Sequence, residues 1–318
     1  MNLRIGSRGS QLALWQANHI AALLREQGHD IEIEIIKTTG DRLQEVTFAQ
    51  VGSKGMFTKE IEEALADGRV DLAVHSLKDL PTELPGSFTL AATPPRVDPR
   101  DVLVSVKYHS LAALPLGAVV GTSSQRRRAQ LLALRPDIQA VEFRGNVDTR
   151  LRKLAEGQVD AILLAAAGLD RLEKTAWVRE RLDPKDFCPA AGQGSLGIET
   201  RKDDSKTISA IAFLDDHATR FAVTAERAAL AALGGGCQVP IGIHCRIAPQ
   251  NEAGEWQEIF AVVADPATGK AIRIHHEARR TEMGPQALGK LVAKKLIEAG
   301  AAPLLEAAAT QPPAGASA

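Results

Sequence analysis

Two stretches of the chain decide its fold: ALADGRVDLAVHSLKDL at residues 64–80 and KLAEGQVDAILLAAAGL at residues 153–169. Each contains the end of a helix, a glycine that stops the helix, and an apolar run typical of a buried strand. Gly68 matches Gly157 at an offset of 89 residues (157 − 68). The alternative is that any junction between a helix and a buried strand has this pattern, without duplication.

A second, looser match favours a duplicated domain. The chain contains IGSRGSQLAL from Ile5 and VGTSSQRRRAQLL from Val120, which align Gly6 with Gly121 at an offset of 115 residues (121 − 6). The two offsets differ by 26 residues (115 − 89), and the aperiodic, glycine-containing stretch 38–57 lies in that interval. Segments of this length without regular structure are often lids or binding loops. The sequence therefore predicts two related α/β domains, with a mobile loop inserted in the first.

The pattern changes after Arg220. A helix, AVTAERAALAAL, ends in Gly234–Gly236, and three apolar stretches and a further helix follow, as in a small α+β domain. The last twelve residues contain small side chains and two prolines, which predicts disorder. The predicted domains are 1–95 with 195–215, then 100–190, then 217–306, followed by a disordered tail at 307–318.

Composition narrows the class of protein. The chain has 318 residues and a formal net charge of −1, and it contains no apolar run of about 18 residues that could span a bilayer. Three cysteines are too few for a disulfide framework, and no secretory signal is evident, so we expect a monomer in the cytoplasm. Neutral charge and 4% aromatic residues argue against a nucleic-acid partner.

Positive charge is concentrated in one segment. Between Arg126 and Lys153 there are eight basic residues and three acidic ones. Thr122, Ser123 and Ser124 precede a predicted helix, where free backbone N–H groups favour an anion. The segment FRGNVDTR at 143–150 repeats this arrangement, and its glycine allows the backbone to approach a ligand closely. The segment predicts an anion site; the alternative is a solvated basic helix face.

Two further motifs contain reactive side chains. In HSLKDLP, residues 75–81, Lys78 and Asp79 follow a buried strand, and ligands of open α/β sheets bind at the carboxyl ends of strands. In GGGCQVPIG, residues 234–242, three glycines expose the Cys237 thiol, which can serve as a nucleophile or as an attachment point. Cys188 and Cys245 have apolar neighbours and are predicted to be buried.

No metal site is expected. The chain contains no HExxH and no CxxC motif. His275 and His276 are adjacent on a predicted strand, so their side chains point to opposite faces of the sheet.

Ten blocks of the sequence, in order, resemble the porphobilinogen deaminase (hydroxymethylbilane synthase) family. They are SRGSQLALWQA, VGSKGMFTKE, VDLAVHSLKDLP, DPRD, GTSSQRR, RGNVDTRL, DAILLAAAGLDRL, PAAGQG, TAERA and GGGCQVPIG. The resemblance implies two α/β domains like type 2 periplasmic binding proteins with a cleft between them, plus the small C-terminal α+β domain. It also implies a transferase that joins four porphobilinogen molecules head to tail, with release of ammonia, to give hydroxymethylbilane for haem biosynthesis.

The resemblance also assigns roles to residues. Cys237 would carry a dipyrromethane cofactor through a thioether bond, and Asp79 would be the catalytic carboxylate. Further cofactor-binding residues would be Ser76, Lys78, Thr122, Ser123, Ser124, Arg126, Arg127 and Gly145. Acetate and propionate groups of the substrate would bind to Arg8, Ser10, Arg144, Arg150 and Arg171. The alternative is a non-catalytic receptor for a small polycarboxylate anion.

Overall fold

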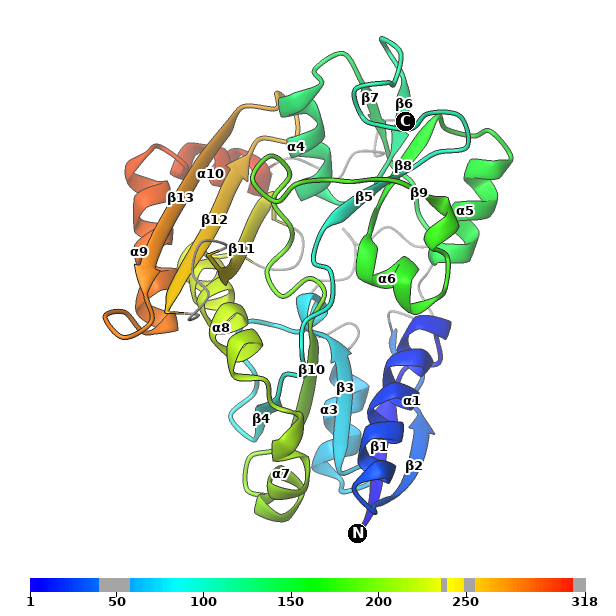
Figure 1. The fold of residues 1–318 in the computed structure, drawn as a ribbon, viewed down its shortest axis with the longest axis vertical. Helices are drawn as coiled ribbons and strands as arrows, with labels where there is room; N and C mark the ends of the chain where they lie inside the picture. The colour runs from blue at the N-terminus through cyan, green and yellow to red at the C-terminus, as the bar shows by residue number, and fades with distance from the viewer. Residues whose placement is uncertain (40–57, 236–238, 249–254, 311–318) are drawn as a thin grey trace. The chain divides into compact units, whose positions relative to one another are not determined.

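The computed structural model describes residues 1–39, 58–235, 239–248 and 255–310 (Figure 1). Nearly all of the predicted mobile loop, and Cys237, lie outside the described residues. Contacts divide the chain into two compact units. Unit 1 comprises Met1–Val97 and Gly194–Arg220, and unit 2 comprises Asp98–Gln193 and the chain from Phe221 onward.

Unit 1 is built on a five-stranded sheet with the strand order β2-β1-β3-β10-β4. Its strands are β1 Asn2–Ser7, β2 Asp30–Ile35, β3 Leu72–Ser76, β4 Phe88–Ala92 and β10 Leu196–Arg201. Its helices are α1 Gln11–Glu26, α3 Lys59–Ala66 and α7 Ser205–Ile211, with the 3-10 turns η1 Leu77–Asp79 and η3 Ala212–Leu214. The apolar side of α1 packs on one face of the sheet, and α3 packs on the other. Both faces of β3 are therefore covered, as its apolar sequence predicts.

The larger sheet of unit 2 has the strand order β7-β6-β8-β5-β9. Its strands are β5 Asp101–Val104, β6 Val119–Gly121, β7 Gln139–Val141, β8 Ala161–Ala165 and β9 Val178–Arg181. Its helices are α4 Gln125–Leu134, α5 Val147–Ala155 and α6 Ala166–Arg171, with the 3-10 turn η2 Thr175–Trp177. As in unit 1, the first three strands in this order run parallel and the last two run antiparallel to their neighbours. The two sheets share one topology.

The internal repeat is confirmed at the level of single hydrogen bonds. In unit 1 the backbone N–H of Arg4 donates to the Asp71 carboxylate at 2.8 Å, and the N–H of Asp71 donates to the Arg4 carbonyl at 2.8 Å. In unit 2 the same reciprocal pair joins Val119 and Asp160, at 2.8 and 2.9 Å. These residues are related by the offsets 115 and 89 that the sequence predicts.

The two matched glycines end equivalent helices. Gly68 follows α3 with φ +67°, and Gly157 follows α5 with φ +79°. Both lie in the left-handed region that favours glycine, which explains why both copies retain this residue. These glycines alone are also expected of unrelated junctions, and it is the shared strand order and the matched hydrogen-bond pairs that argue against an accidental pattern.

The C-terminal part forms a three-stranded antiparallel sheet in the order β11-β12-β13 (Figure 1). Its elements are α8 His217–Ala232, β11 Ile241–Ile247, β12 Trp256–Ala264, β13 Ala271–Arg279, α9 Pro285–Glu298 and α10 Ala302–Thr310. One face of the sheet packs on apolar side chains of these three helices. The predicted small α+β architecture is confirmed.

The other face of this sheet packs partly on α4. Ala129 of α4 lies in one apolar cluster with Cys188, Phe260, Val262 and Ala264. This packing places the predicted second and third domains in one compact unit, although their sheets are separate. The division of the chain into three domains stays a prediction.

The predicted tail begins too early. Helix α10 continues to Thr310, so residues 307–310 are helical and not disordered, and residues 311–318 lie outside the described residues. The sequence there contains a run of alanines, which have the highest helix propensity, and α10 is held by packing of Leu304 in the core.

The repeat predicts a stability effect. Substitution Asp160→Ala removes the acceptor of the Val119 N–H and leaves that donor without its partner. We expect a loss of about 1–3 kcal/mol in the free energy of unfolding, measured with urea. Asp203→Ala, at an exposed position, is the control and should change it by less than about 0.5 kcal/mol. Equal effects of the two substitutions would contradict the role of Asp160.

Candidate anion-binding and catalytic site

In unit 1 the predicted site residues follow two neighbouring parallel strands. Arg8 and Ser10 come after β1, and Lys78 and Asp79 lie in η1, directly after β3. The Ser10 hydroxyl caps α1 by accepting the backbone N–H of Ala13 at 3.3 Å. Because parallel strands end at the same edge, this arrangement brings the two motifs to one edge of the sheet, as ligand sites of such sheets require.

The turn after β3 is anchored to its surroundings. Gln16 of α1 is buried and donates its Nε2–H to the Ser76 hydroxyl at 2.7 Å. The backbone N–H of Leu77 donates to the carbonyl of Ser195 at 3.0 Å. Within this anchored turn, Asp79 is exposed and Lys78 is half-buried. The turn therefore presents a carboxylate to solvent from a fixed backbone.

In unit 2 the predicted residues follow three parallel strands, β6, β7 and β8. Thr122, Ser123 and Ser124 lie between β6 and α4, and Arg171 is the last residue of α6, which follows β8. The hydroxyls organise the loop: Ser124 accepts the N–H of Arg127, and Ser123 donates to the carbonyl of Phe143 at 2.7 Å. The predicted helix start after GTSS is confirmed.

Gly145 lies after β7 in a conformation that a side chain would disturb. Its φ is +125°, and an added Cβ would lie 2.7 Å from the side chain of Thr149. The following residue, Asn146, caps α5 by accepting the N–H of Thr149 at 2.8 Å. The loop can therefore turn sharply into the helix with its backbone uncovered by a side chain.

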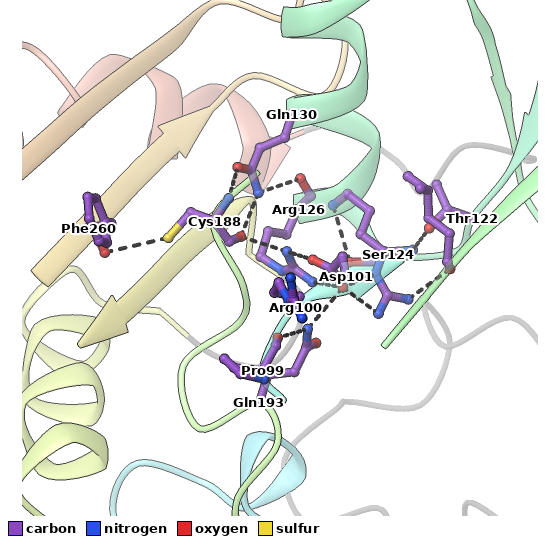
Figure 2. Close-up of polar contacts among 12 residues, drawn as sticks. Pro99, Arg100, Asp101, Thr122, Ser124, Arg126, Gln130, Cys188, Gln193 and Phe260 are labelled. Carbon is purple, nitrogen blue, oxygen red and sulfur yellow. Dashed lines mark hydrogen bonds and ion pairs between the residues drawn. The ribbon is translucent and has the colours of Figure 1, made fainter. Parts of the chain in front are cut away.

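Two consecutive arginines converge on one buried carboxylate (Figure 2). Arg126 donates from both terminal nitrogens to Asp101, at 2.6 and 3.2 Å. Arg127 donates to the same carboxylate from Nε at 2.9 Å and forms an ion pair with it through Nη2 at 2.8 Å. All three side chains are buried, with exposed fractions of 0–6%. The alternative of a solvated basic helix face is wrong for these two residues.

The ionisation of Asp101 follows from these pairs. Burial alone would raise the pKa of the Asp101 carboxyl, but the charges of Arg126 and Arg127 outweigh burial and hold the pKa well below its ordinary value. The cluster of one carboxylate and two guanidinium groups therefore keeps a net charge of +1. A buried positive excess of this kind favours an anion nearby.

The segment after β9 completes this network. Gln193 donates to Asp101 at 3.0 Å and to the carbonyl of Pro99 at 2.7 Å (Figure 2). Arg126 and Gln130 both donate to the carbonyl of Cys188, at 2.7 and 2.9 Å. The predicted burial of Cys188 is confirmed, and burial raises the pKa of its thiol, so this cysteine is structural.

Arg150 lies near two other guanidinium groups of unit 2. Burial, together with the charges of Arg127 and Arg144, lowers the pKa of Arg150 to about 10. Its Nε is buried and has no hydrogen-bond partner among the described residues. Burial also lowers the pKa of Arg171 to about 10. Guanidinium groups that repel each other in a buried place are stabilised by a bound carboxylate or phosphate.

Sequence reasoning missed the residue that holds the two arginines. Asp101 is the last residue of DPRD, which the resemblance includes without a role. The sequence signal for Asp101 is its position at the start of an apolar strand, because an aspartate buried there needs cations as partners.

Glu226, in TAERA, was also missed. It is fully buried and accepts the N–H groups of Gly192 and Cys245, at 2.6 and 2.8 Å.

Together these features define an α/β protein with candidate anion-binding groups after the carboxyl ends of its parallel strands. Two family models match the chain: "Porphobilinogen deaminase, dipyromethane cofactor binding domain" over residues 3–209, and "Porphobilinogen deaminase, C-terminal domain" over residues 220–298. The chain belongs to the porphobilinogen deaminase family.

Curated relatives agree with this assignment. Porphobilinogen deaminase from Nitratidesulfovibrio vulgaris (strain DP4) is 49% identical, and the match covers 96% of each chain. The proteins of the same name from Brevibacillus brevis and Chromobacterium violaceum are 47% and 46% identical, over 95% and 97% of this chain and 96% and 98% of theirs.

Solved structures with a similar arrangement include periplasmic binding proteins. A putative methionine-binding lipoprotein from Bacillus subtilis has a TM-score of 0.42 and 14% identity, covering 67% of this chain and 89% of that chain. A periplasmic substrate-binding protein of an ABC transporter from Coxiella burnetii has a TM-score of 0.43 and 16% identity, covering 69% and 94%. The α/β class itself is confirmed by the strand order described above. No helix among the described residues is long and apolar enough to span a membrane.

The Asp101 cluster predicts a large stability effect. Substitution Asp101→Asn removes the negative charge and leaves two guanidinium groups buried without compensation. We expect a loss of about 3–5 kcal/mol in the free energy of unfolding. Asp137→Asn is the control: it also removes an arginine partner, Arg135, but near the surface, where solvent screens the pair. A smaller loss for Asp101 than for Asp137 would contradict the central role of the cluster.

The same pair predicts a pH dependence. The folded pKa of Asp101 lies below the unfolded value of about 4, so its stabilisation is complete above that pH. As the pH falls below about 4 the unfolded chain takes up the proton first, and the stabilisation is lost. The difference in stability between the wild type and Asp101→Asn should therefore be constant from pH 5 to 7 and shrink below about pH 4, as measured by urea unfolding.

Proposed function

We propose that this chain acts as its family does, condensing porphobilinogen on a dipyrromethane primer, with Asp79 as catalytic carboxylate and Cys237 as point of attachment. The observation that supports the proposal most strongly is the crowding of Arg150 with Arg127 and Arg144. Each pyrrole of the substrate carries two carboxylates, so the growing product is a polyanion that needs several fixed cations. The receptor alternative gives no use to the family's cofactor-binding domain.

Unit 2 supplies the carboxylate-binding groups in this proposal. Arg144, Arg150 and Arg171 pair with acetate and propionate side chains, and Arg127 is oriented toward that task by Asp101. The residues present fit a dipyrromethane, because its acid groups would compensate the burial and, to a smaller extent, the repulsion by Arg127 and Arg144 that lower the pKa of Arg150 to about 10. When bound, the cofactor supplies the free pyrrole carbon on which the chain is extended.

Arg126 has a different role in this proposal. Its terminal nitrogens bind Asp101 and the carbonyl of Cys188, which joins α4 to the segment after β9. Binding of the cofactor by Arg126 stays a prediction, and the contacts favour a supporting role. The hydroxyls of Thr122, Ser123 and Ser124 lie at the helix start where backbone N–H groups can add to carboxylate binding.

Unit 1 supplies the proton chemistry. The exposed carboxylate of Asp79 stabilises the positive charge that develops on the substrate when ammonia leaves, and it accepts the proton that the attacking pyrrole loses. Arg8 and Ser10 bind acid groups of the substrate, and Lys78, at the same edge of the sheet, binds a carboxylate of the cofactor. Ser76, whose hydroxyl accepts a hydrogen bond from Gln16, keeps its own proton for a carboxylate. The cytoplasm as location and a monomeric state belong to this proposal as well.

Asp79 is tested by substitution. Asp79→Asn keeps the shape and removes the charge, so we expect kcat to fall by about 10²–10⁴-fold, measured as consumption of porphobilinogen. The exposed position should leave the unfolding midpoint unchanged. Asp203→Asn, also exposed, is the matched control and should keep full turnover. Near-normal turnover of Asp79→Asn would exclude the catalytic role.

Attachment of the primer is measured independently by intact mass. Wild type and Asp79→Asn should both carry the additional mass of a dipyrromethane, and Cys237→Ala should not. A wild-type protein of unmodified mass that fails to take up the primer on incubation with porphobilinogen would overturn the proposed function.

Carboxylate binding is tested within a single helix. Arg150 and Arg152 both lie on α5, but Arg150 is half-buried and is repelled by Arg127 and Arg144, whereas Arg152 is exposed and pairs with Glu156. Arg150→Met should lower kcat/KM by about 10- to 100-fold, the loss of one charge-assisted hydrogen bond. Arg152→Met should leave it unchanged. Equal values for the two variants would remove Arg150 from the site.

A further inference from the structure

Three side chains that can ligate a metal ion, none of them assigned to the proposed active site, converge on the C-terminal sheet. Glu258 lies on the central strand β12, and His275 and Glu277 lie on the edge strand β13. The register pairs Glu258 directly with Glu277 and places His275 opposite Phe260. One ligand atom from each of the three residues lies within 4.8 Å of the other two.

These side chains share the sheet face that is turned away from α9. His276, the next residue along β13, interacts with Lys295 of α9 at 3.0 Å. Because side chains alternate along a strand, His275 and Glu277 project from the opposite face. The predicted opposite orientation of His275 and His276 is therefore confirmed. The two carboxylates near His275 belong to Glu258, on the neighbouring strand, and to Glu277, two residues further along β13. A search for motifs of paired histidines does not include such residues.

The spacing of the ligand atoms suits a small divalent ion. His275 Nε2 lies 3.2 Å from an oxygen of Glu258 and 3.7 Å from an oxygen of Glu277. Four ligands at 2.0–2.2 Å from a tetrahedral zinc ion lie roughly 3.3–3.6 Å from each other. Both observed distances are close to that spacing, so the three groups could receive an ion with only small side-chain movements.

Two neighbours orient the ligands. Arg246 donates to Oε1 of Glu258 at 2.6 Å, and this leaves Oε2 directed at His275. The imidazole of His275 stacks on Phe260, with ring centroids 4.6 Å apart and planes inclined by 6°. A hydrogen bond that orients a carboxylate, as Arg246 does for Glu258, is common among metal ligands, and the stacking on Phe260 restricts the ring of His275. Glu258 is buried, but the side chains of His275 and Glu277 are 47% and 46% exposed, so an ion and a completing water have access from solvent.

We propose that Glu258, His275 and Glu277 form a site for one divalent transition-metal ion, with Zn²⁺ as the preferred occupant. One imidazole with two carboxylates suits ions of borderline softness, whereas Mg²⁺ and Ca²⁺ favour oxygen ligands alone. Binding replaces the hydrogen bond between His275 and Glu258 by two bonds to the ion and links the edge strand to the centre of the sheet. The site is independent of the proposed function.

The experiment is a calorimetric titration of the purified holoprotein with ZnCl₂, with MgCl₂ as a parallel probe. We expect one zinc ion per chain and no saturable magnesium binding. His275→Ala should weaken zinc binding by at least about tenfold, and Glu277→Gln, at an exposed position, should weaken it as well. His276→Ala, the adjacent histidine on the other face, is the matched control and should bind zinc as the wild type does.

Cobalt distinguishes this site from the cysteines. Co²⁺ added to the holoprotein should give visible d–d bands without a charge-transfer band from thiolate, and His275→Ala should lose these bands. Zinc binding that is unchanged in both His275→Ala and Glu277→Gln would overturn the proposal. So would a thiolate band, or a wild-type protein that binds no zinc.

Discussion

The carboxylate of Asp101 compensates two arginines in the interior of unit 2, and the anion-binding part of the site depends on this interaction (Figure 2). A guanidinium group taken out of water without a counter-charge costs several kcal/mol, so Arg126 and Arg127 can be buried only because Asp101 is there. One carboxylate shared between two arginines leaves a positive excess. The same three side chains thus pack the interior of unit 2 and contribute a net positive charge that favours anions nearby.

The distribution of roles between the two arginines follows from their neighbours. Arg126 points its remaining donor at the carbonyl of Cys188 and so ties α4 to the segment that leaves β9. Arg127 instead affects Arg150, whose pKa it lowers together with burial and Arg144. Arg127 also donates its Nη1–H to a backbone carbonyl, that of Leu163 on β8, at 3.1 Å, so both arginines tie α4 to neighbouring segments of unit 2.

Much of the architecture was accessible from the sequence, because it is encoded locally. The duplicated junctions of glycine and apolar strand, the helix caps Ser124 and Asn146, and the burial of Cys188 and Cys245 all follow from short patterns. The family and its activity were accessible for the same reason, since ten separate motifs occur in order. The error at residues 307–310 also has a local cause: small side chains suggested disorder, but alanine favours helix once Leu304 packs in the core.

By itself the sequence determined the duplicated helix, glycine and strand junctions, and the concentration of positive charge between Arg126 and Lys153. It could not determine partners that lie far apart along the chain. Asp101 and Arg126 are 25 residues apart, and Glu258 and His275 are 17 apart. Hydrophobic periodicity specifies the face of a strand, but the register between strands and the packing of helix on sheet arise only when the whole core forms. For this reason only the tertiary structure decided which acid neutralises the arginines and which carboxylates meet His275.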